Sequence, residues 1–187
     1  MIEVEAKYKI KDETTREELL RVLEPLFTSP VMQRRQIDTV FHLPDQVGKP
    51  IAPGSKIMRV RDTIDIENGQ AKSSMTLKVA GKVRLASQEY EFAVSSGDDA
   101  RAMLAALGWQ HIVTVDKVRV ESKIGRYGAC IDEVASAGLF IELEVLAEEN
   151  ADVAAVQRGM QTFLEELDIK GEPWHIPYDT TVLQYTP

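Results

Sequence analysis

The stretch Glu3-Val4-Glu5-Ala6-Lys7-Tyr8-Lys9 carries a charged residue at every second position. Because a β-strand sends alternate side chains to the same face, Glu3, Glu5 and Lys7 would project together. The opposite face is apolar, and we expect it to pack against protein. The charged face must then point either into bulk solvent or into a polar interior that holds a ligand.

The same alternation of charged and apolar residues recurs in five later segments, which are residues 56–61, 76–78, 89–92, 117–120 and 142–145. One such strand is an ordinary solvated sheet face. Six of them are better explained if the sheet closes into a barrel, because the charged faces then share one interior. Basic residues on some strands would face acidic residues on others across that interior.

Eight strands are predicted, over residues 2–11, 34–43, 56–65, 73–81, 84–94, 110–122, 125–134 and 138–147. Turn residues such as Asn68-Gly69 and Gly81-Lys82 separate neighbouring strands, which must then be antiparallel. Residues 44–55 read as a loop. The segment from Lys170 onward contains Gly171, Pro173 and Pro177, and we expect it to form no regular element.

Three helices are predicted in the remaining segments. Thr15 and Glu18 have the spacing of a capping box, and apolar residues follow at helical intervals as far as Leu26. Asp98 and Asp99 open a second helix that ends at Gly108, and Asn150 caps a third that continues to Leu167. The fold class is therefore α+β, with an eight-stranded, mainly antiparallel closed β-barrel and flanking helices in one domain over residues 1–187.

Composition narrows the possible partners and location. The chain has 187 residues and a formal net charge of −8, which disfavours binding of nucleic acid through a basic surface. No apolar run approaches the roughly 20 residues that span a bilayer, so no membrane partner is expected. Cys130, the single cysteine, lies in an apolar run and reads as a buried structural thiol. The N-terminus is acidic and strand-like and shows no secretory signal. This feature and the lone cysteine are typical of a cytoplasmic protein.

The sequence gives little support for a zinc site, a serine hydrolase or a glycine-rich phosphate loop. His42, His111 and His175 are dispersed and have no cysteine partners, so a zinc site is not expected. The chain contains neither the GxSxG motif of serine hydrolases nor the glycine-rich phosphate loops that precede helices. Trp109 and Trp174 are isolated and read as core or interface anchors.

The ordered set of charged motifs resembles the CYTH superfamily, also called triphosphate tunnel metalloenzymes. The N-terminal Glu3-x-Glu5-x-Lys7 looks like the signature of that family, and the companions follow in the family's order. They are Asp38, Arg59-x-Arg61, Lys78, Glu89-x-Glu91, Lys117-x-Arg119, Asp132, Glu142-x-Glu144 and Tyr178-Asp179. The resemblance extends over nearly the whole chain. It implies a barrel-shaped tunnel that binds a triphosphate and a divalent metal ion.

The residue types fit the roles that the resemblance implies. Arginine offers a planar fork and lysine a compact charge to phosphate oxygens. The expected triphosphate ligands are Lys7, Arg59, Arg61, Lys78, Lys117 and Arg119, of which Lys7, Arg59, Lys78 and Lys117 are assigned a catalytic role. Mg²⁺ or Mn²⁺ is the expected cofactor, because hard cations prefer carboxylate oxygens. The expected metal ligands are Glu3, Glu5, Glu142 and Glu144, while Asp38, Glu89, Glu91 and Asp132 are metal ligands or partners that orient the cations.

Several alternatives stay open at the level of sequence. The charges could neutralise one another with no ligand, but buried ion pairs are a poor route to stability. Asp38 could be a structural hydrogen-bond acceptor, and Arg34 or Arg35 could reach the tunnel mouth. Alternation sends Asp132 and Glu133 to opposite faces, and we predict that Asp132 points inward. Tyr178 either closes over the tunnel or packs against it.

The family includes inorganic triphosphatases, thiamine triphosphatases and class IV adenylyl cyclases. The His-Phe pair that precedes the glutamates in those cyclases is absent, since Met1 and Ile2 stand there. Hydrolysis of an inorganic or organic triphosphate is therefore the preferred activity, with conversion of ATP to cyclic AMP and pyrophosphate as the alternative. A non-catalytic sensor of triphosphate or polyphosphate is a further possibility. The sequence does not determine the oligomeric state, and a homodimer stays among the alternatives.

Overall fold

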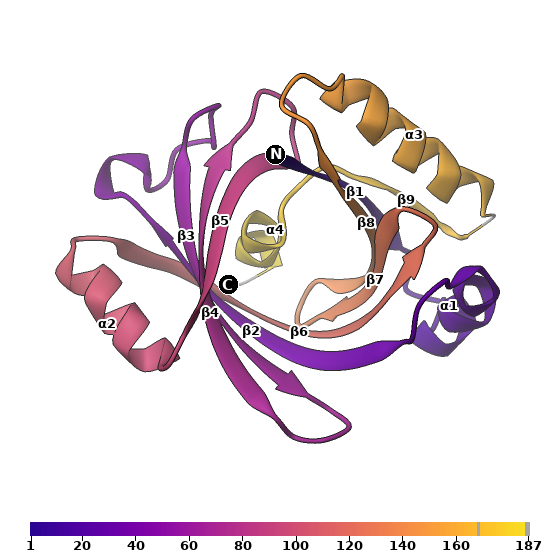
Figure 1. Ribbon diagram of the computed structural model, residues 1–187, viewed down its shortest axis with the longest axis horizontal. Helices are drawn as coiled ribbons and strands as arrows, with labels where there is room; N and C mark the ends of the chain where they lie inside the picture. Colours follow the sequence, from indigo (N-terminus) through magenta and orange to yellow (C-terminus); the bar gives the residue numbers. More distant parts are fainter. Residues whose placement is uncertain (168, 186–187) are drawn as a thin grey trace.

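Eight antiparallel strands close into a barrel in the computed structural model, which describes residues 1–167 and 169–185 (Figure 1). They are β1 (Ile2–Ile10), β2 (Met32–His42), β3 (Lys56–Asp65), β4 (Ala71–Ala80), β5 (Ala86–Val94), β6 (Gln110–Ile124), β7 (Tyr127–Val134) and β8 (Gly138–Ala147). Their order is β5-β4-β3-β2-β6-β7-β8-β1, and β1 pairs back onto β5. The predicted eight-stranded closed barrel and the α+β class are confirmed.

The C-terminal segment is more ordered than its composition predicted. A ninth strand, β9 (Gly171–Trp174), pairs with β1, and helix α4 (Tyr178–Tyr185) follows it. The expectation of no regular element from Lys170 onward is therefore wrong. Pro173 is tolerated because β9 lies at the edge of the sheet, where a missing N–H costs no ladder bond. Pro177 directly precedes α4, where the start of a helix accepts proline.

The remaining helices lie outside the barrel and begin close to the predicted positions. Helix α1 (Arg16–Leu23) has the predicted capping box at Thr15 and continues into a 3-10 turn over Glu24–Leu26. Helix α2 (Gly97–Ala106) is capped by Ser96, so its first turn contains Asp98 and Asp99. Helix α3 (Val153–Glu166) is capped by Asp152, and the prediction of an Asn150 cap is wrong. A second 3-10 turn, Pro44–Gln46, lies inside the predicted loop 44–55.

Apolar side chains gather in three clusters. The largest packs α1 and α3 against the outer faces of β1, β7 and β8, and another packs α2 against β2, β3 and β4. The outer face of β5 has no such cover, since Tyr90 and Phe92 are each more than half exposed. The apolar face of β1, by contrast, packs against protein as predicted, since Val4, Ala6 and Tyr8 are buried.

Helix α4 lies within the ring of strands (Figure 1). Its Val182 is 6% exposed and belongs to the third apolar cluster, with Val40, Val113 and Phe140 of the barrel wall. The side chains of α4 and the strands line a cavity of about 1090 Å³. The described residues include no helix that is both long and apolar enough to cross a membrane.

Candidate functional site

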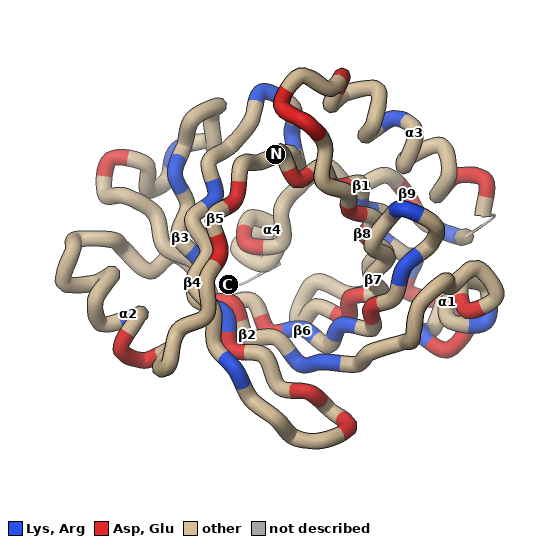
Figure 2. The backbone as a smooth tube through the Cα atoms, viewed as in Figure 1, with Lys and Arg blue, Asp and Glu red and all other residues tan. Residues whose placement is uncertain are grey.

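Strand register brings the predicted charged residues together inside the barrel. Glu5 lies opposite Glu144 and Lys7 opposite Glu142 on the β1–β8 ladder. Asp38 lies opposite Arg61 on the β2–β3 ladder. Figure 2 shows Lys, Arg, Asp and Glu distributed along the strands that surround the barrel interior. Side chains alternate across a strand, so the pairing register decides which residues of each strand face inward. The observed register directs these charged side chains into the barrel.

Asp132 is the buried centre of one network. Its carboxylate is fully buried and accepts hydrogen bonds from Arg119 at 2.7 and 2.6 Å and from Lys117 at 3.2 Å. Arg119 also donates to Glu142 at 3.0 Å, and Glu142 pairs with Lys7 at 2.9 Å. A fully buried carboxylate needs this many partners to remain charged.

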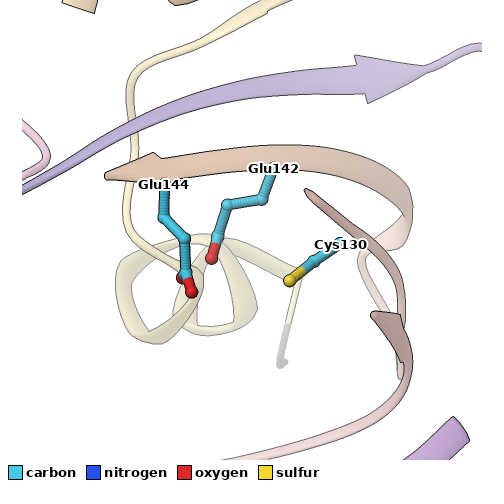
Figure 3. Close-up of side chains that lie close together, drawn as sticks. All are labelled: Cys130, Glu142 and Glu144. Atoms are coloured by element: carbon cyan, nitrogen blue, oxygen red, sulfur yellow. The ribbon is translucent and has the colours of Figure 1, made fainter. Parts of the chain in front are cut away.

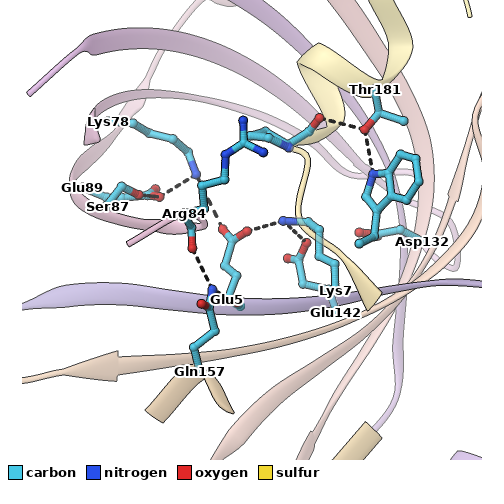
Figure 4. A network of polar contacts seen from close by, with 12 residues as sticks. Glu5, Lys7, Lys78, Arg84, Ser87, Glu89, Asp132, Glu142, Gln157 and Thr181 are labelled. Atoms are coloured by element: carbon cyan, nitrogen blue, oxygen red, sulfur yellow. Dashed lines mark hydrogen bonds and ion pairs between the residues drawn. The ribbon is translucent and has the colours of Figure 1, made fainter. Parts of the chain in front are cut away.

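The same network continues along β1. Lys7 also pairs with Glu5 (Figure 4), and Glu5 lies 3.8 Å from Lys78. Burial by itself raises the pKa of Glu5 and Glu142, but the neighbouring cations outweigh it. The pKa of Glu5 is therefore lowered, and that of Glu142 is held well below its ordinary value. Both carboxylates are therefore ion-paired with lysine or arginine side chains.

A second set of ion pairs lines the wall formed by β2 to β5. Asp38 accepts two hydrogen bonds from Arg61, at 2.6 and 2.7 Å, and its pKa is lowered because Arg61 outweighs the effect of burial. Arg59 donates to Glu91 at 3.2 Å, and Lys78 pairs with Glu89 at 2.5 Å. Asp38, Glu89 and Glu91 are thus each paired with a cation, and Asp38 binds Arg61 in the bidentate geometry that is typical of arginine–carboxylate pairs.

Two carboxylates stand apart from these pairs. Among the residues that the structure describes, no ion pair or hydrogen bond reaches the carboxylates of Glu3 and Glu144. Burial raises the pKa of Glu3 to about 8, and Glu89, Glu5 and Glu144 add to the rise. Burial and Glu142 likewise raise the pKa of Glu144. Both acids therefore lie where a further cation would be stabilised.

The unpaired carboxylates of Glu3 and Glu144, together with acidic neighbours that are paired with lysine, fit a hard divalent metal ion. Glu3, Glu5 and Glu89 each offer an oxygen within 4.8 Å of the others, and Glu144 lies across the ladder from Glu5. Mg²⁺ and Mn²⁺ prefer such an all-oxygen set. All four predicted metal ligands, Glu3, Glu5, Glu142 and Glu144, line the cavity. Glu5 and Glu142 are each paired with two cations, whereas Glu3 and Glu144 have no ion pair within the described residues.

Cys130 lies beside Glu142 and Glu144, within 4.8 Å of their oxygens (Figure 3). The prediction that it is buried is confirmed, since it is 3% exposed. Burial raises the pKa of its thiol well above the ordinary value, which keeps the sulfur protonated. A neutral thiol is a poor metal ligand, so the oxygen donors define the site.

Glycine makes room for one of the candidate metal ligands. A Cβ atom on Gly128 would lie 2.8 Å from Cγ of Glu144, too close for any side chain. The two residues face each other on the β7–β8 ladder. The glycine therefore sets the position of the Glu144 carboxylate.

Tyr178 of α4 closes over the two lysines at the centre of the network. The ring centroid lies 4.9 Å from Nζ of Lys7 and 4.8 Å from Nζ of Lys117, within reach of cation–π contacts. Burial lowers the pKa of Lys117, and Arg119 adds to the decrease. Of the two positions considered for Tyr178, the structure shows the one over the tunnel.

Other sequence predictions can be compared with the structure directly. Asp132 points inward while Glu133 is exposed, as predicted. Arg34 lines the cavity and pairs with Glu121, whereas Arg35 is bound to Asp116 on the surface. Sequence reasoning missed Arg84, which lines the cavity, and Gln157, whose side chain binds the backbone carbonyls of Glu5 and Arg84.

The fold and the interior together define a class of protein. It is a closed antiparallel barrel in which paired cations could bind a polyanion and unpaired carboxylates could bind a metal ion. The chain belongs to the CYTH domain family, whose model matches residues 1–173. A protein of Methanocaldococcus jannaschii named "Putative adenylate cyclase" is 27% identical over 169 residues, which cover 90% of this chain and 91% of that protein.

Solved structures share the fold. The PH1819 protein of Pyrococcus horikoshii superposes with a TM-score of 0.78 at 21% identity, covering 97% of this chain and 98% of the other. A protein of Vibrio parahaemolyticus described as "a putative adenylate cyclase" gives a TM-score of 0.72 at 15% identity, covering 98% of each chain. At these identities the likeness concerns the barrel architecture.

Proposed function

We propose that this protein is a divalent-metal-dependent triphosphatase that binds an inorganic or organic triphosphate inside the barrel. The observation that carries the proposal is the unequal pairing of charges in the cavity. Within the described part of the chain, Glu3 and Glu144 form no ion pair with a cation, although the neighbouring acids do. A metal ion would supply that cation, and a triphosphate would engage the arginines and lysines opposite.

The residues of the chain have distinct tasks in this proposal. Arg59, Arg61 and Lys78 on one wall, and Lys7, Lys117 and Arg119 on the other, neutralise charge that builds on the phosphate oxygens. Their carboxylate partners hold them in place before substrate arrives, so little reorganisation is needed. Glu3, Glu5 and Glu144 would hold Mg²⁺ or Mn²⁺. When bound, that ion would add Lewis-acid stabilisation of the phosphates and orient them.

Water attacking the terminal phosphorus would give orthophosphate and a diphosphate product. In that reaction the chain binds and orients the phosphates, while Tyr178 and the apolar residues of α4 limit access of bulk water to Lys7 and Lys117. Catalysis would then rest on positioning and electrostatics.

Adenylyl cyclase activity is the second candidate, because the Methanocaldococcus jannaschii relative carries the name "Putative adenylate cyclase". In this reaction the ribose 3′-hydroxyl of ATP attacks the α-phosphorus, and pyrophosphate leaves. The cavity is also lined by Ile57, Ile112, Ile176 and Leu183, which could contact an organic group beside the charged wall. The same arginines and lysines would bind the triphosphate, which would lie at a different position in the cavity.

One assay separates these activities. Inorganic triphosphate and ATP are each incubated with Mg²⁺ or Mn²⁺, and phosphate, pyrophosphate and cyclic AMP are followed together. Phosphate without cyclic AMP supports the hydrolase, and cyclic AMP with stoichiometric pyrophosphate supports the cyclase. Tight metal-independent binding without turnover would favour a sensor.

Charge reversal tests the site itself. Arg59→Glu should abolish either activity, because it places a like charge against the substrate, whereas Arg35→Glu on the outer surface should leave turnover within about twofold of wild type. Full turnover by Arg59→Glu would refute the assignment.

A further inference from the structure

The loop of residues 81–85 between β4 and β5 is held firmly at the cavity. The Gly81 N–H donates to the Ala86 carbonyl at 2.9 Å, and a Cβ on Gly81 would lie 2.7 Å from that oxygen. Leu85 adopts a left-handed backbone with φ of 58°, which is costly for a leucine. Its carbonyl accepts a hydrogen bond from the Glu5 N–H at 2.8 Å. The loop is thus a defined structure that abuts a candidate metal ligand.

Gln157 of α3 clasps this loop to β1. Its Nε2 donates to the backbone carbonyl of Glu5 at 2.8 Å and to that of Arg84 at 2.7 Å (Figure 4). Both amide protons are therefore used to join β1 to the loop at the end of the β1–β5 ladder. The clasp fixes the backbone from which the Arg84 side chain extends.

The Arg84 side chain lines the cavity at its exposed mouth. Within residues 1–167 and 169–185, no carboxylate or other acceptor binds its guanidinium. The six predicted phosphate-binding cations differ, since each of them has a carboxylate partner. An arginine whose backbone is fixed beside the cavity and whose guanidinium has no acidic partner among the described residues keeps its five donors available for phosphate oxygens.

We propose that Arg84 is a further substrate-binding residue that contacts phosphate oxygens of the bound triphosphate, and that Gln157 is a positioning residue acting through Arg84. The inference rests on the proposed function and adds a ligand that the ordered motifs do not contain. The strained Leu85 and the clasp are then the structural means of keeping the guanidinium at the mouth of the cavity.

The test is calorimetric binding of inorganic triphosphate to the full chain in the presence of Mg²⁺. Arg84→Gln should weaken binding by about tenfold or more, the loss expected for a charge-assisted hydrogen bond to phosphate. Arg158→Gln is the matched control, because it removes the same charge beside Gln157 from an exposed position on α3. It should change affinity by less than about twofold.

Gln157→Ala should also weaken binding, but it should have no further effect in the Arg84→Gln background. A purely structural role for Gln157 would instead weaken binding in both backgrounds and overturn the positioning role. Thermal denaturation of each variant verifies folding. If wild type binds triphosphate and Arg84→Gln binds equally well, the Arg84 inference is wrong and the proposed function stands. If wild type binds no triphosphate, the proposed function fails and this inference fails with it.

Discussion

Glu3 makes the metal-free protein sensitive to pH in a direction opposite to that of most acids. Its pKa rises from 4.5 to about 8 on folding, mainly because of burial. Between these values the folded protein holds a proton that the unfolded chain has lost. Stability must therefore fall as pH rises from about 5 to 8.

The size of this effect can be bounded. Three pH units at about 1.4 kcal/mol each give an upper limit of about 4 kcal/mol for the loss between pH 5 and 8. Because the carboxyl is partly exposed, solvent screening reduces the expected loss to about 2 kcal/mol. Glu3→Gln removes the titrating group and should flatten the profile by that amount.

The assay is denaturant unfolding of the metal-free protein at pH 5, 6.5 and 8. Wild type and Glu3→Gln are compared with Glu13→Gln, which changes an exposed acid in the turn after β1. Addition of Mg²⁺ at pH 8 should restore stability to wild type, by about 2.7 kcal/mol at one hundred times its dissociation constant, and less to Glu3→Gln. Equal pH slopes in wild type and Glu3→Gln, or equal responses to Mg²⁺, would refute the reasoning.

Substitutions at three interior positions, with matched controls, give further tests. Asp132→Ala removes the carboxylate partner of buried Lys117 and leaves Arg119 with Glu142 alone, so it should cost about 3–5 kcal/mol of unfolding free energy in denaturant titrations. Asp116→Ala at an exposed pair should cost less than about 1 kcal/mol, and equal losses would contradict the burial argument. Tyr178→Phe keeps the ring over the lysines and should retain stability within about 1 kcal/mol, while Tyr178→Ala should lose about 3 kcal/mol by thermal or chemical unfolding. Gly128→Ala should displace Glu144 and weaken Mg²⁺ binding about tenfold in calorimetry, and unchanged affinity would exclude Glu144 as a ligand.

Much of the barrel could be predicted because strand periodicity is a local property. Alternation along β1 and β8 assigns Glu5 and Glu144 to one face whatever lies elsewhere in the chain. Turn glycines likewise mark strand ends, and Gly69 and Gly138 both have the positive φ that their turns require. The strand β9 and the helix α4 were not predicted, because their prolines indicate an end of regular structure. An edge strand and the start of a helix both accept proline.

The sequence by itself determined which residues face the interior, since side-chain parity within a strand depends only on neighbouring residues. The tertiary structure decided which of those charges are paired. It separates Glu142, which is bound to two cations, from Glu144, which has the same spacing pattern and no ion pair within the described residues. It also brings Gln157 to Glu5 across 152 residues of chain and places α4 inside the barrel. Such pairings depend on strand order and side-chain distance in space, which no local pattern encodes.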